Sequence, residues 1–326
     1  MGNSNKIAVI IVNFNGKEFL GQCLESLQRQ VFLNFKIIVV DNSSDDRSVD
    51  GLEERFPGVE VMRMDENVGF AAANNYAIKK AEGFQWVALL NPDAIAKPDW
   101  LLTLHIAAEK NPRYNFFGSK LIKESSPEQL DGTGDIYHLC GLAWRRDHGA
   151  VENKNSRLAE EIFSPCAAAA MYRRDIVLEV GGFDERFFCY FEDIDLAFRL
   201  RLLGHRCLYV PNAKVGHFGS AIAGRRSDFA VYHGHRNMVW TYLKNMPSEL
   251  LWRGLLQHLL VNFASLIWFS LHGQAGPIFR AKRDALLGLR QTIKQRKSIQ
   301  KNMKVTSENL KKVLATDWFL PYFKNR

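Results

Sequence analysis

The first hundred residues alternate short apolar runs with stretches in which apolar positions recur every three or four residues. Continuous apolar runs predict strands that are buried on both faces, and the recurring positions between them predict helices. The four predicted strands are "IAVIIV" (residues 7–12), "FKIIVVD" (Phe35–Asp41), "VEVMRM" (residues 59–64) and "WVALLN" (residues 86–91). Strands that alternate with helices predict an α/β fold, in which helices cover both faces of a parallel sheet.

Polar residues follow the predicted strands at residues 13–16, 41–45, 67–69 and 91–93. Because ligands of such sheets bind at the carboxyl ends of the strands, we expect a ligand site along this edge. The first loop, "VNFNG", lacks the G-x-G-x-x-G pattern of a dinucleotide-binding fold. The sequence therefore argues against a Rossmann dehydrogenase.

Each of these loops also has a purely structural interpretation. Asn15 and Gly16 are typical of an ordinary turn. Asp41 is placed to accept hydrogen bonds from a ribose or a base, whereas the polar residues after it could cap the next helix. Asp93, in "LLNPDA", suits a divalent cation that bridges phosphate oxygens, but Pro-Asp is also a common turn.

The middle of the chain, residues 116–217, is less regular and contains the acidic stretch "FFCYFEDIDLAFRL". A helix is expected from about Asp193, and Asp195 and Arg199 are spaced to form an i, i+4 ion pair. Glu192 and Asp193 then lie at the helix start. A carboxylate there can accept the proton of an attacking hydroxyl. The alternative is a helix cap beside a surface ion pair.

The last third of the chain is rich in Leu, Trp and Phe, and residues 254–271 contain no Asp, Glu, Lys or Arg. That length approaches a membrane span. Interspersed polar residues favour an amphipathic helix that packs on the body or lies in a membrane interface. Residues 280–312 have a net charge of +9 while the whole protein has +8, so the remainder is close to neutral. This segment predicts an anionic partner, either a membrane surface or a nucleic acid.

The composition is that of a globular protein, with 47% hydrophobic and 24% charged residues among 326. The five cysteines form no C-x-x-C pair, so neither a zinc site nor a disulfide framework is indicated. Residues 1–6 contain no apolar signal segment. We therefore expect reduced thiols and a cytoplasmic protein.

Several motifs in this order and spacing resemble the family 2 glycosyltransferases of the GT-A fold, in particular a rhamnosyltransferase-like branch. They are "VIIVNFNG", "VVDNSSDD", "ENVGFAAANN", "LLNPDA", "GGFDERFFCYFEDIDLAFRL", "VGHFGS" and "YHGHRNMVWTYLKNMP". The resemblance implies a Rossmann-like, mostly parallel central sheet flanked by helices in a catalytic domain of residues 1–247. Residues 248–326 would be a helical, basic extension in contact with a membrane surface or another subunit.

The resemblance also implies a donor site over the strand ends, occupied by a nucleotide-diphosphate sugar. Asn13 and Asn15 would line the nucleotide pocket, and Asp41 would hydrogen-bond the base. Asn67 and Gly69 would shape the wall near the ribose and phosphates.

By the same resemblance, Asp93 would bind Mg²⁺ or Mn²⁺, with His217 as the second ligand. Asn91 replaces the first acid of the family's metal motif, which puts its contact with the ribose in doubt. Arg236 and Asn237 would lie near the diphosphate.

The catalytic residue implied by the resemblance is Asp193, acting as the general base. Glu192 and Asp195 would lie on the acceptor side or support it.

The function implied is that of a metal-dependent, inverting glycosyltransferase of bacterial surface polysaccharide synthesis, with rhamnose favoured. The acceptor would be a glycan or a polyprenyl-diphosphate-linked sugar, reached by a peripheral protein at the inner face of the plasma membrane. A homodimer is left open. The alternatives are transfer of galactofuranose, N-acetylglucosamine or glucose, an inactive sugar-nucleotide-binding protein, and a nucleic-acid-binding protein. The near-neutral body argues against nucleic acid, and the presence of both Asp93 and Asp193 argues against an inactive protein.

Overall fold

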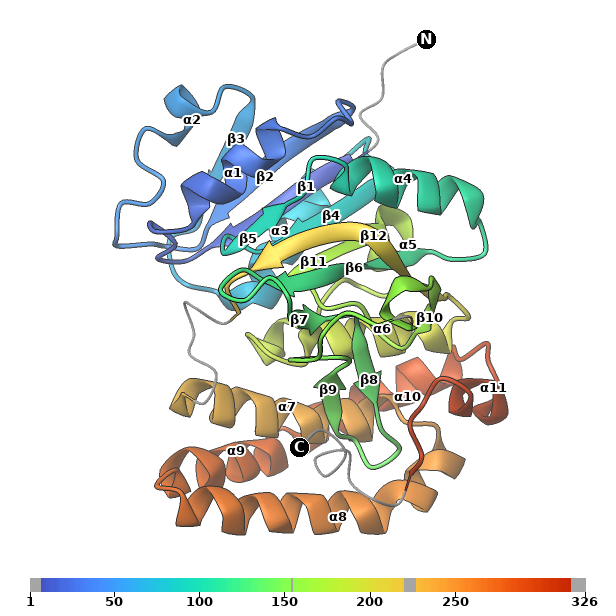
Figure 1. The fold of residues 1–326 in the computed structure, drawn as a ribbon. Coiled ribbons are helices and arrows are strands. Elements are labelled where there is room, and N and C mark those ends of the chain that lie inside the picture. Colours follow the sequence, from blue (N-terminus) through green and yellow to red (C-terminus); the bar gives the residue numbers. More distant parts are fainter. Residues whose placement is uncertain (1–6, 154, 220–226, 318–326) are drawn as a thin grey trace.

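The computed structural model describes residues 7–153, 155–219 and 227–317, so the predicted absence of a signal segment in residues 1–6 lies outside it. A mixed sheet forms its centre (Figure 1), in the order β10-β12-β6-β11-β4-β1-β2-β3, with β5 beside β12 and β7 beside β6. The strands are β1 (Ile7–Asn13), β2 (Phe35–Asp41), β3 (Val59–Arg63), β4 (Trp86–Leu90), β5 (Ala94–Ala96), β6 (Phe116–Lys123), β7 (Leu130–Gly132), β8 (Asp135–Tyr137), β9 (Ala143–Arg145), β10 (Glu160–Ile162), β11 (Ala169–Arg173) and β12 (Cys207–His217).

Helices cover both faces of this sheet and form a further layer beyond it. They are α1 (Leu20–Gln28), α2 (Leu52–Arg55), α3 (Gly69–Lys80), α4 (Trp100–Lys110), α5 (Arg174–Glu179), α6 (Glu192–Leu202), α7 (Asp228–Asn245), α8 (Ser248–Leu271), α9 (Ala275–Leu287), α10 (Leu289–Lys301) and α11 (Ser307–Lys311). Short 3₁₀ turns lie at Asn155–Arg157 and Glu185–Phe187.

The four predicted strands are confirmed as β1 to β4, which pair in parallel. β1 and β4 are buried throughout, as continuous apolar runs require, whereas β3, at the edge of the sheet, is only partly buried. Beyond β4 the sheet differs from a simple parallel one, because β11 runs antiparallel between β4 and β6. The parallel register places Asn13 of β1 beside Asp41 of β2, so the first two strands end together.

The two faces of the sheet have separate cores because side chains alternate along a strand. Val9 and Ile11 of β1 pack with residues of α1 and α4, whereas Ala8 and Ile10 pack with residues of α3, α5 and α6. A third core joins α6 to α7, α8 and α11. Helix α6 therefore contacts the sheet on one side and the C-terminal helices on the other.

A buried ion network fixes α6 against α7. Asp195 is fully buried and pairs with Arg199 at 2.8 Å and with Lys244 of α7 at 2.7 Å. Asn245 donates a further hydrogen bond to Asp195 at 2.7 Å, and Lys244 also pairs with Asp184 at 2.7 Å. The predicted pair of Asp195 and Arg199 is confirmed, but it lies in the core rather than on the surface.

Helices α9 and α10 pack along α7, and α8 lies beside α9 at the far side from the sheet (Figure 1). Helix α7 belongs to this layer although it precedes residue 248. The predicted division at residue 247 therefore falls between two helices of one packed layer, and it stays a prediction. The described cysteines are all free, and four of the five are buried, as expected of reduced core thiols.

We predict that Asp195→Ala lowers the free energy of unfolding by about 3–5 kcal/mol, because it leaves Arg199 and Lys244 buried without their shared carboxylate. Glu60→Ala serves as the control, since Glu60 forms a half-exposed pair with Lys36 and such pairs contribute about 0–1 kcal/mol. Urea unfolding of both variants measures the difference. Equal effects of the two substitutions would show that the buried network does not hold α6.

Candidate active site

The ends of β1 and β2 form the first part of the site. The Asn13 side chain is buried and donates from Nδ2 to Asp41 at 3.3 Å, to Ser44 at 3.1 Å and to Ser48 at 2.8 Å. Asn15 has a positive φ of 54°, and its side chain accepts a hydrogen bond from the backbone N–H of Asp45 at 3.0 Å. The structure thus brings Asn13, Asn15 and Asp41 together, and their contact with a nucleotide stays a prediction.

Asn67 and Gly69 connect this edge to the loop that precedes α6. The Asn67 side chain accepts hydrogen bonds from Asn42 at 2.8 Å and from the backbone N–H of Gly69 at 3.0 Å. Gly69 has a φ of 83°, and a Cβ there would lie 2.6 Å from the ring of Phe188. Only glycine combines this conformation with such a close approach. Asn67 therefore links the end of β2 to the start of α3, and Gly69 allows the Phe188 loop to pack closely there.

Asp93 and His217 come together as the resemblance implied. His217 ends β12 and pairs in register with Ala94, which follows Asp93. Both side chains are buried, and His217 Nε2 lies 3.4 Å from Asp93 Oδ1. His217 Nε2 has no hydrogen-bond partner within the described part of the chain. Asn91 lies at the same strand end, where its backbone N–H donates to Ala168 at 2.9 Å.

Asp131 of β7 orients His217, and the sequence analysis did not identify it. Asp131 accepts hydrogen bonds from His217 Nδ1 at 2.8 Å and from Arg145 at 2.6 Å. Burial alone would raise the pKa of Asp131, but hydrogen bonds from His148 and His217 and the charge of Arg145 hold it well below its usual range. An ionised Asp131 keeps the proton on Nδ1 of His217, so Nε2, which faces Asp93, is the nitrogen that can take up a further proton or bind a cation.

This arrangement fits a divalent cation. A histidine that binds a metal usually donates its other N–H to a carboxylate, and here Asp131 is that carboxylate. The unpartnered Nε2 of His217 and the carboxylate of Asp93 supply one nitrogen and one oxygen donor, which suits Mn²⁺ somewhat better than Mg²⁺. Burial works to lower the pKa of His217, but its contacts with Asp131 and Asp93 outweigh that effect and raise the pKa.

Asp193 lies in the first turn of α6. Its two carboxylate oxygens accept hydrogen bonds from the backbone N–H groups of Ile194 at 2.8 Å and Ala167 at 3.2 Å. The side chain remains partly exposed, whereas the neighbouring Glu192 is buried. The carboxylate is therefore both fixed in place and open to a substrate.

The loop before α6 is strained, and two predicted site residues hold it. Phe188, Tyr190 and Phe191 all have positive φ values, of 65°, 67° and 67°, a conformation that costs non-glycine residues free energy. Asn237 donates to the carbonyls of Phe187, Cys189 and Tyr190. Arg236 donates to the carbonyls of Arg186 and Phe187. The predicted contact of this pair with a diphosphate stays a prediction.

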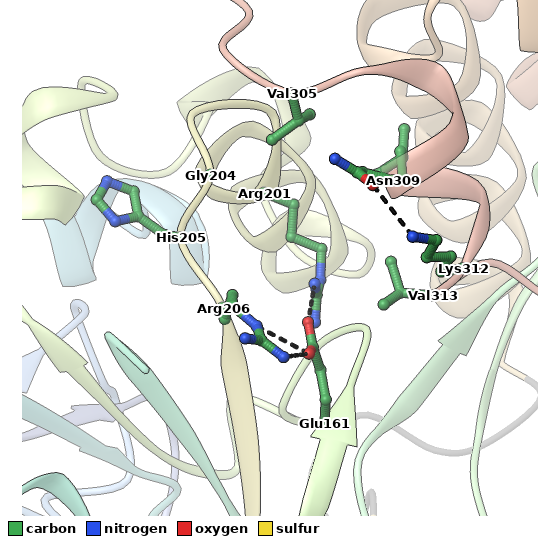
Figure 2. Close-up of a pocket in the computed structure, with 10 residues that line it drawn as sticks. Glu161, Arg201, Gly204, His205, Arg206, Val305, Asn309, Lys312 and Val313 are labelled. Carbon is green, nitrogen blue, oxygen red and sulfur yellow. Dashed lines mark hydrogen bonds and ion pairs between the residues drawn. The ribbon is translucent and has the colours of Figure 1, made fainter. Parts of the chain in front are cut away.

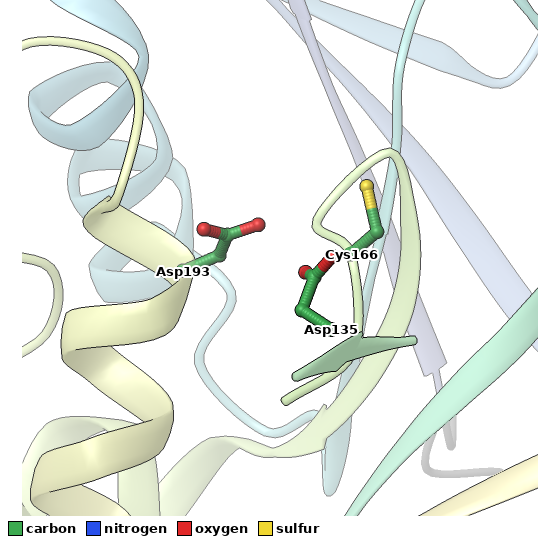
Figure 3. Close-up of side chains that lie close together, drawn as sticks. All are labelled: Asp135, Cys166 and Asp193. Atoms are coloured by element: carbon green, nitrogen blue, oxygen red, sulfur yellow. The ribbon is translucent and has the colours of Figure 1, made fainter. Parts of the chain in front are cut away.

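Asp135 and Cys166 lie beside Asp193, with one donor atom of each within 4.8 Å of the others (Figure 3). Burial and the charge of Asp193 raise the pKa of Asp135 to about 8. The same two causes raise the pKa of Glu192 well above its usual value.

Burial also raises the pKa of Asp193, but the hydrogen bonds from Ala167 and Ile194 oppose this shift. Helix N-termini further favour a negative charge. Protons therefore stay on Asp135 and Glu192, and Asp193 is the carboxyl group of the three that ionises first.

A metal ion is disfavoured at the Asp135–Cys166–Asp193 cluster. The guanidinium of Arg145 lies 2.7 Å from Cys166 and 4.0 Å from Asp135, so a positive charge is already present. Burial also raises the pKa of the Cys166 thiol, which keeps it protonated. The cluster is suited to proton transfer, and the cation fits the pair of Asp93 and His217.

A cavity of about 410 Å³ lies at the other end of α6, between Arg201, Arg206 and the α11 segment (Figure 2). Both arginines pair with Glu161. Arg201 is in the last turn of α6, and an eleven-residue helix separates its two ends by roughly 16 Å. This cavity is therefore separate from the strand-end site.

Comparison with known proteins identifies relatives over most of the chain. The sequence model described as Glycosyl transferase family 2 matches residues 8–181, which is more than half of the chain. N-acetylglucosaminyl-diphospho-decaprenol L-rhamnosyltransferase of Mycobacterium tuberculosis (strain H37Rv) is 28% identical over 251 residues, which cover 70% of this chain and 81% of that protein. Rhamnosyltransferase WbbL of Escherichia coli (strain K12) is 29% identical over 260 residues, with 73% and 92% covered.

Solved structures show the same fold. The mannosyltransferase PcManGT of Pyrobaculum calidifontis, solved in complex with GDP-Man and Mn²⁺, superposes with a TM-score of 0.54 at 17% identity. The superposition covers 90% of this chain and 84% of that one. The predicted GT-A fold is confirmed.

We predict that Asp131→Asn weakens Mn²⁺ binding about 10–100-fold, because a carboxylate that accepts the other N–H of a metal-binding histidine typically contributes that much. The control is Asp147→Asn, since Asp147 lies in the same region and accepts from Thr133. Calorimetric titration with Mn²⁺ alone measures both. Unchanged Mn²⁺ affinity in Asp131→Asn would contradict the orienting role.

Proposed function

The chain belongs to glycosyl transferase family 2, and on this premise we propose that it transfers L-rhamnose from a nucleoside-diphosphate donor to a hydroxyl of a membrane-borne acceptor, with inversion at the anomeric carbon. Two relatives that align with this chain over most of their own length are named rhamnosyltransferases, and these names support the choice of sugar. Galactofuranose, N-acetylglucosamine and glucose are the alternative sugars.

The observation that carries this proposal is the state of Asp193. A general base must be ionised at the working pH and must lie within reach of the hydroxyl that it deprotonates. Two backbone N–H groups favour the ionised form of Asp193 and oppose the rise in pKa that burial causes, and its side chain is partly exposed to a substrate. Glu192 and Asp135 keep their protons beside it.

The proposed reaction is a single displacement. Asp193 accepts the proton of the acceptor hydroxyl while that oxygen forms its bond to the anomeric carbon. The bond to the nucleoside diphosphate breaks on the opposite face, so the configuration inverts and no covalent enzyme intermediate forms. Only one ionised carboxylate is needed, in agreement with the protonated state of its neighbours.

On the donor side, Asn13 and Asp41 would bind the nucleoside at the ends of β1 and β2. Asp93 and His217 would hold Mg²⁺ or Mn²⁺, which when bound offsets the charge of the leaving diphosphate.

Arg236 and Asn237 act through the loop of residues 187–191 that they brace. Direct contact of Arg236 with the diphosphate would require it to release some of these hydrogen bonds.

The acceptor proposed here is a sugar linked to a polyprenyl diphosphate. The name of the Mycobacterium tuberculosis relative gives a decaprenol-linked acceptor for that protein. A lipid-linked acceptor would require this protein to work at the inner face of the plasma membrane as a peripheral enzyme of surface polysaccharide synthesis.

We predict that Asp193→Asn lowers turnover about 10²–10⁴-fold while the donor affinity stays near that of the wild type, because the change removes the base and keeps the shape. Nucleoside diphosphate released from a panel of nucleotide sugars measures turnover, and calorimetry measures donor binding. Asp175→Asn is the control, because Asp175 is a largely exposed carboxylate on α5. Retention of more than about a tenth of turnover in Asp193→Asn would exclude it as the base.

We also predict that the KM for the donor rises above about pH 8 in the wild type and not in Asp135→Asn. Burial and the charge of Asp193 raise the pKa of Asp135 to about 8. Below that pH the side chain is neutral, as asparagine is, so the variant should keep wild-type kcat at pH 7. Above it, a second carboxylate repels the anionic donor. A KM profile that is the same in both proteins would contradict this assignment.

A further inference from the structure

Helix α8 exposes a continuous apolar stripe on the side away from the sheet. The stripe recurs at helical spacing, and its side chains are between 48% and 78% exposed: Trp252, Leu256, Leu259, Leu260, Phe263, Ile267, Trp268 and Leu271. Phe279, Leu286 and Leu287 continue it on α9. These eleven residues, called the apolar face below, include more than half of the large hydrophobic side chains that are exposed in the described part of the chain. A patch of this extent on a protein surface marks an interaction site.

Exposed basic side chains lie on the two helices that carry the apolar face and on α10, which follows them. The exposed ones on α8, α9 and α10 are Arg253, Arg280, Arg283, Arg290, Lys294, Lys297 and Lys301. The acids of these helices, Glu249 and Asp284, each pair with a neighbouring arginine, at 3.5 Å and 2.8 Å. These exposed basic residues, called the basic rim below, therefore give the surface of the three helices a net positive charge.

Helix α8 is fixed along the body rather than free to cross a membrane. By length and composition it could span a membrane, and only 17% of its most apolar 18-residue window is buried inside the protein. Its N-terminal half is nevertheless anchored by two close contacts. A Cβ at Gly254 would lie 2.4 Å from the carbonyl oxygen of Leu139. His258 is buried, stacks on Tyr242 at 4.0 Å and hydrogen-bonds the carbonyl of Cys140 at 2.8 Å.

We propose that the apolar face is the docking surface for an anionic lipid bilayer, with α8 lying in the plane of the interface. The inference rests on the proposed function, which places the acceptor in a membrane. Trp252 and Trp268 near the two ends of the stripe suit the boundary between headgroups and acyl chains. An apolar face combined with basic residues supplies the two signals that stable peripheral attachment needs.

The charge of the rim identifies lipid rather than a second copy of the chain as the occupant. Two copies that buried their apolar faces against each other would bring two basic rims together, and like charges across an interface oppose association. An anionic leaflet complements the same rim, and each basic residue near it adds affinity.

The structure also indicates that only some of the basic residues in this segment can contact the bilayer. The sequence attributes the positive charge to residues 280–312 as a whole. Lys282, however, donates to Asn262 at 2.5 Å between α8 and α9. Arg296 donates to the carbonyls of Leu243 and Met246. These two side chains brace the helical layer, so the exposed arginines of α9 and α10 supply the contact with lipid.

Flotation of the full chain with vesicles tests the proposal. We expect co-flotation with phosphatidylglycerol vesicles, weak flotation with phosphatidylcholine vesicles, and release as salt rises. The triple variant Leu256→Ser, Leu260→Ser, Phe263→Ser should lose binding to both vesicles. Its control is Val31→Ser, Leu33→Ser, which removes exposed apolar side chains from a distant loop and should bind as the wild type does.

A second triple variant separates charge from apolar contact. Arg280→Gln, Arg283→Gln, Arg290→Gln should lower the partition coefficient on phosphatidylglycerol at least about tenfold. It should have little effect on phosphatidylcholine. The control changes three exposed basic residues elsewhere: Arg29→Gln, Lys79→Gln, Lys80→Gln. Equal binding of the wild type to both vesicles, or unchanged binding in the arginine variant, would overturn the role of charge.

A short-chain, water-soluble acceptor distinguishes failure of docking from failure of the proposed function. The docking variants should keep wild-type turnover on it, and Asp193→Asn should float as the wild type does. Flotation without transfer to any acceptor would refute the function and leave docking standing. No flotation, together with a dimer in sedimentation that the serine variant dissociates, would overturn docking in favour of contact between two copies.

Discussion

The position of the proposed base depends on the buried network around Asp195. Burying several charges is costly, and such a network is a weak source of net stability even when every partner is present. Its effect is on geometry, because Asp195 must lie between Arg199 and Lys244 and no nearby position offers the same partners. Asp193 is two residues away on the same helix. The network therefore sets where the catalytic carboxylate lies, and it does so from the core rather than from the site.

The same reasoning explains how several nearby carboxyl groups have different protonation states. Asp131 is ionised because a guanidinium and a histidine pair with it. Glu192 is buried next to Asp193, and one of its carboxyl oxygens has no partner within the described residues, so it holds its proton. Asp193 has no cation in direct contact; burial raises its pKa, and two backbone N–H groups oppose that shift. Chemically similar side chains thus acquire three tasks: metal support, proton retention and proton acceptance.

The sequence predicted those features that depend on local pattern. The strands β1 to β4 follow from continuous apolar runs, and the pair of Asp195 and Arg199 follows from helical spacing. The antiparallel position of β11 between β4 and β6 could not be predicted, because it depends on pairing with strands that are distant in the sequence. Asp131 was missed for the same reason, since 86 residues separate it from His217 and the "DGTGD" stretch resembles an ordinary turn. The bracing by Arg236 was also hidden, because its partners are backbone carbonyls that no residue type reveals.

Helix α7 connects the strained loop of the site to the helices that carry the apolar face. Arg236 holds the carbonyl of Phe187 and stacks on Trp240 at 4.6 Å, and Trp240 donates to the carbonyl of Ala285 on α9 at 3.0 Å. A Cβ at Gly288 would lie 2.5 Å from the Trp240 ring, so α7 and the α9–α10 junction are in direct contact. Coupling between two sites requires an element with two alternative arrangements. The close contacts along this path instead favour one arrangement. Docking through α8 and α9 would therefore fix the height and orientation of Asp193 above the bilayer, and the length of the acceptor's linkage must match that height.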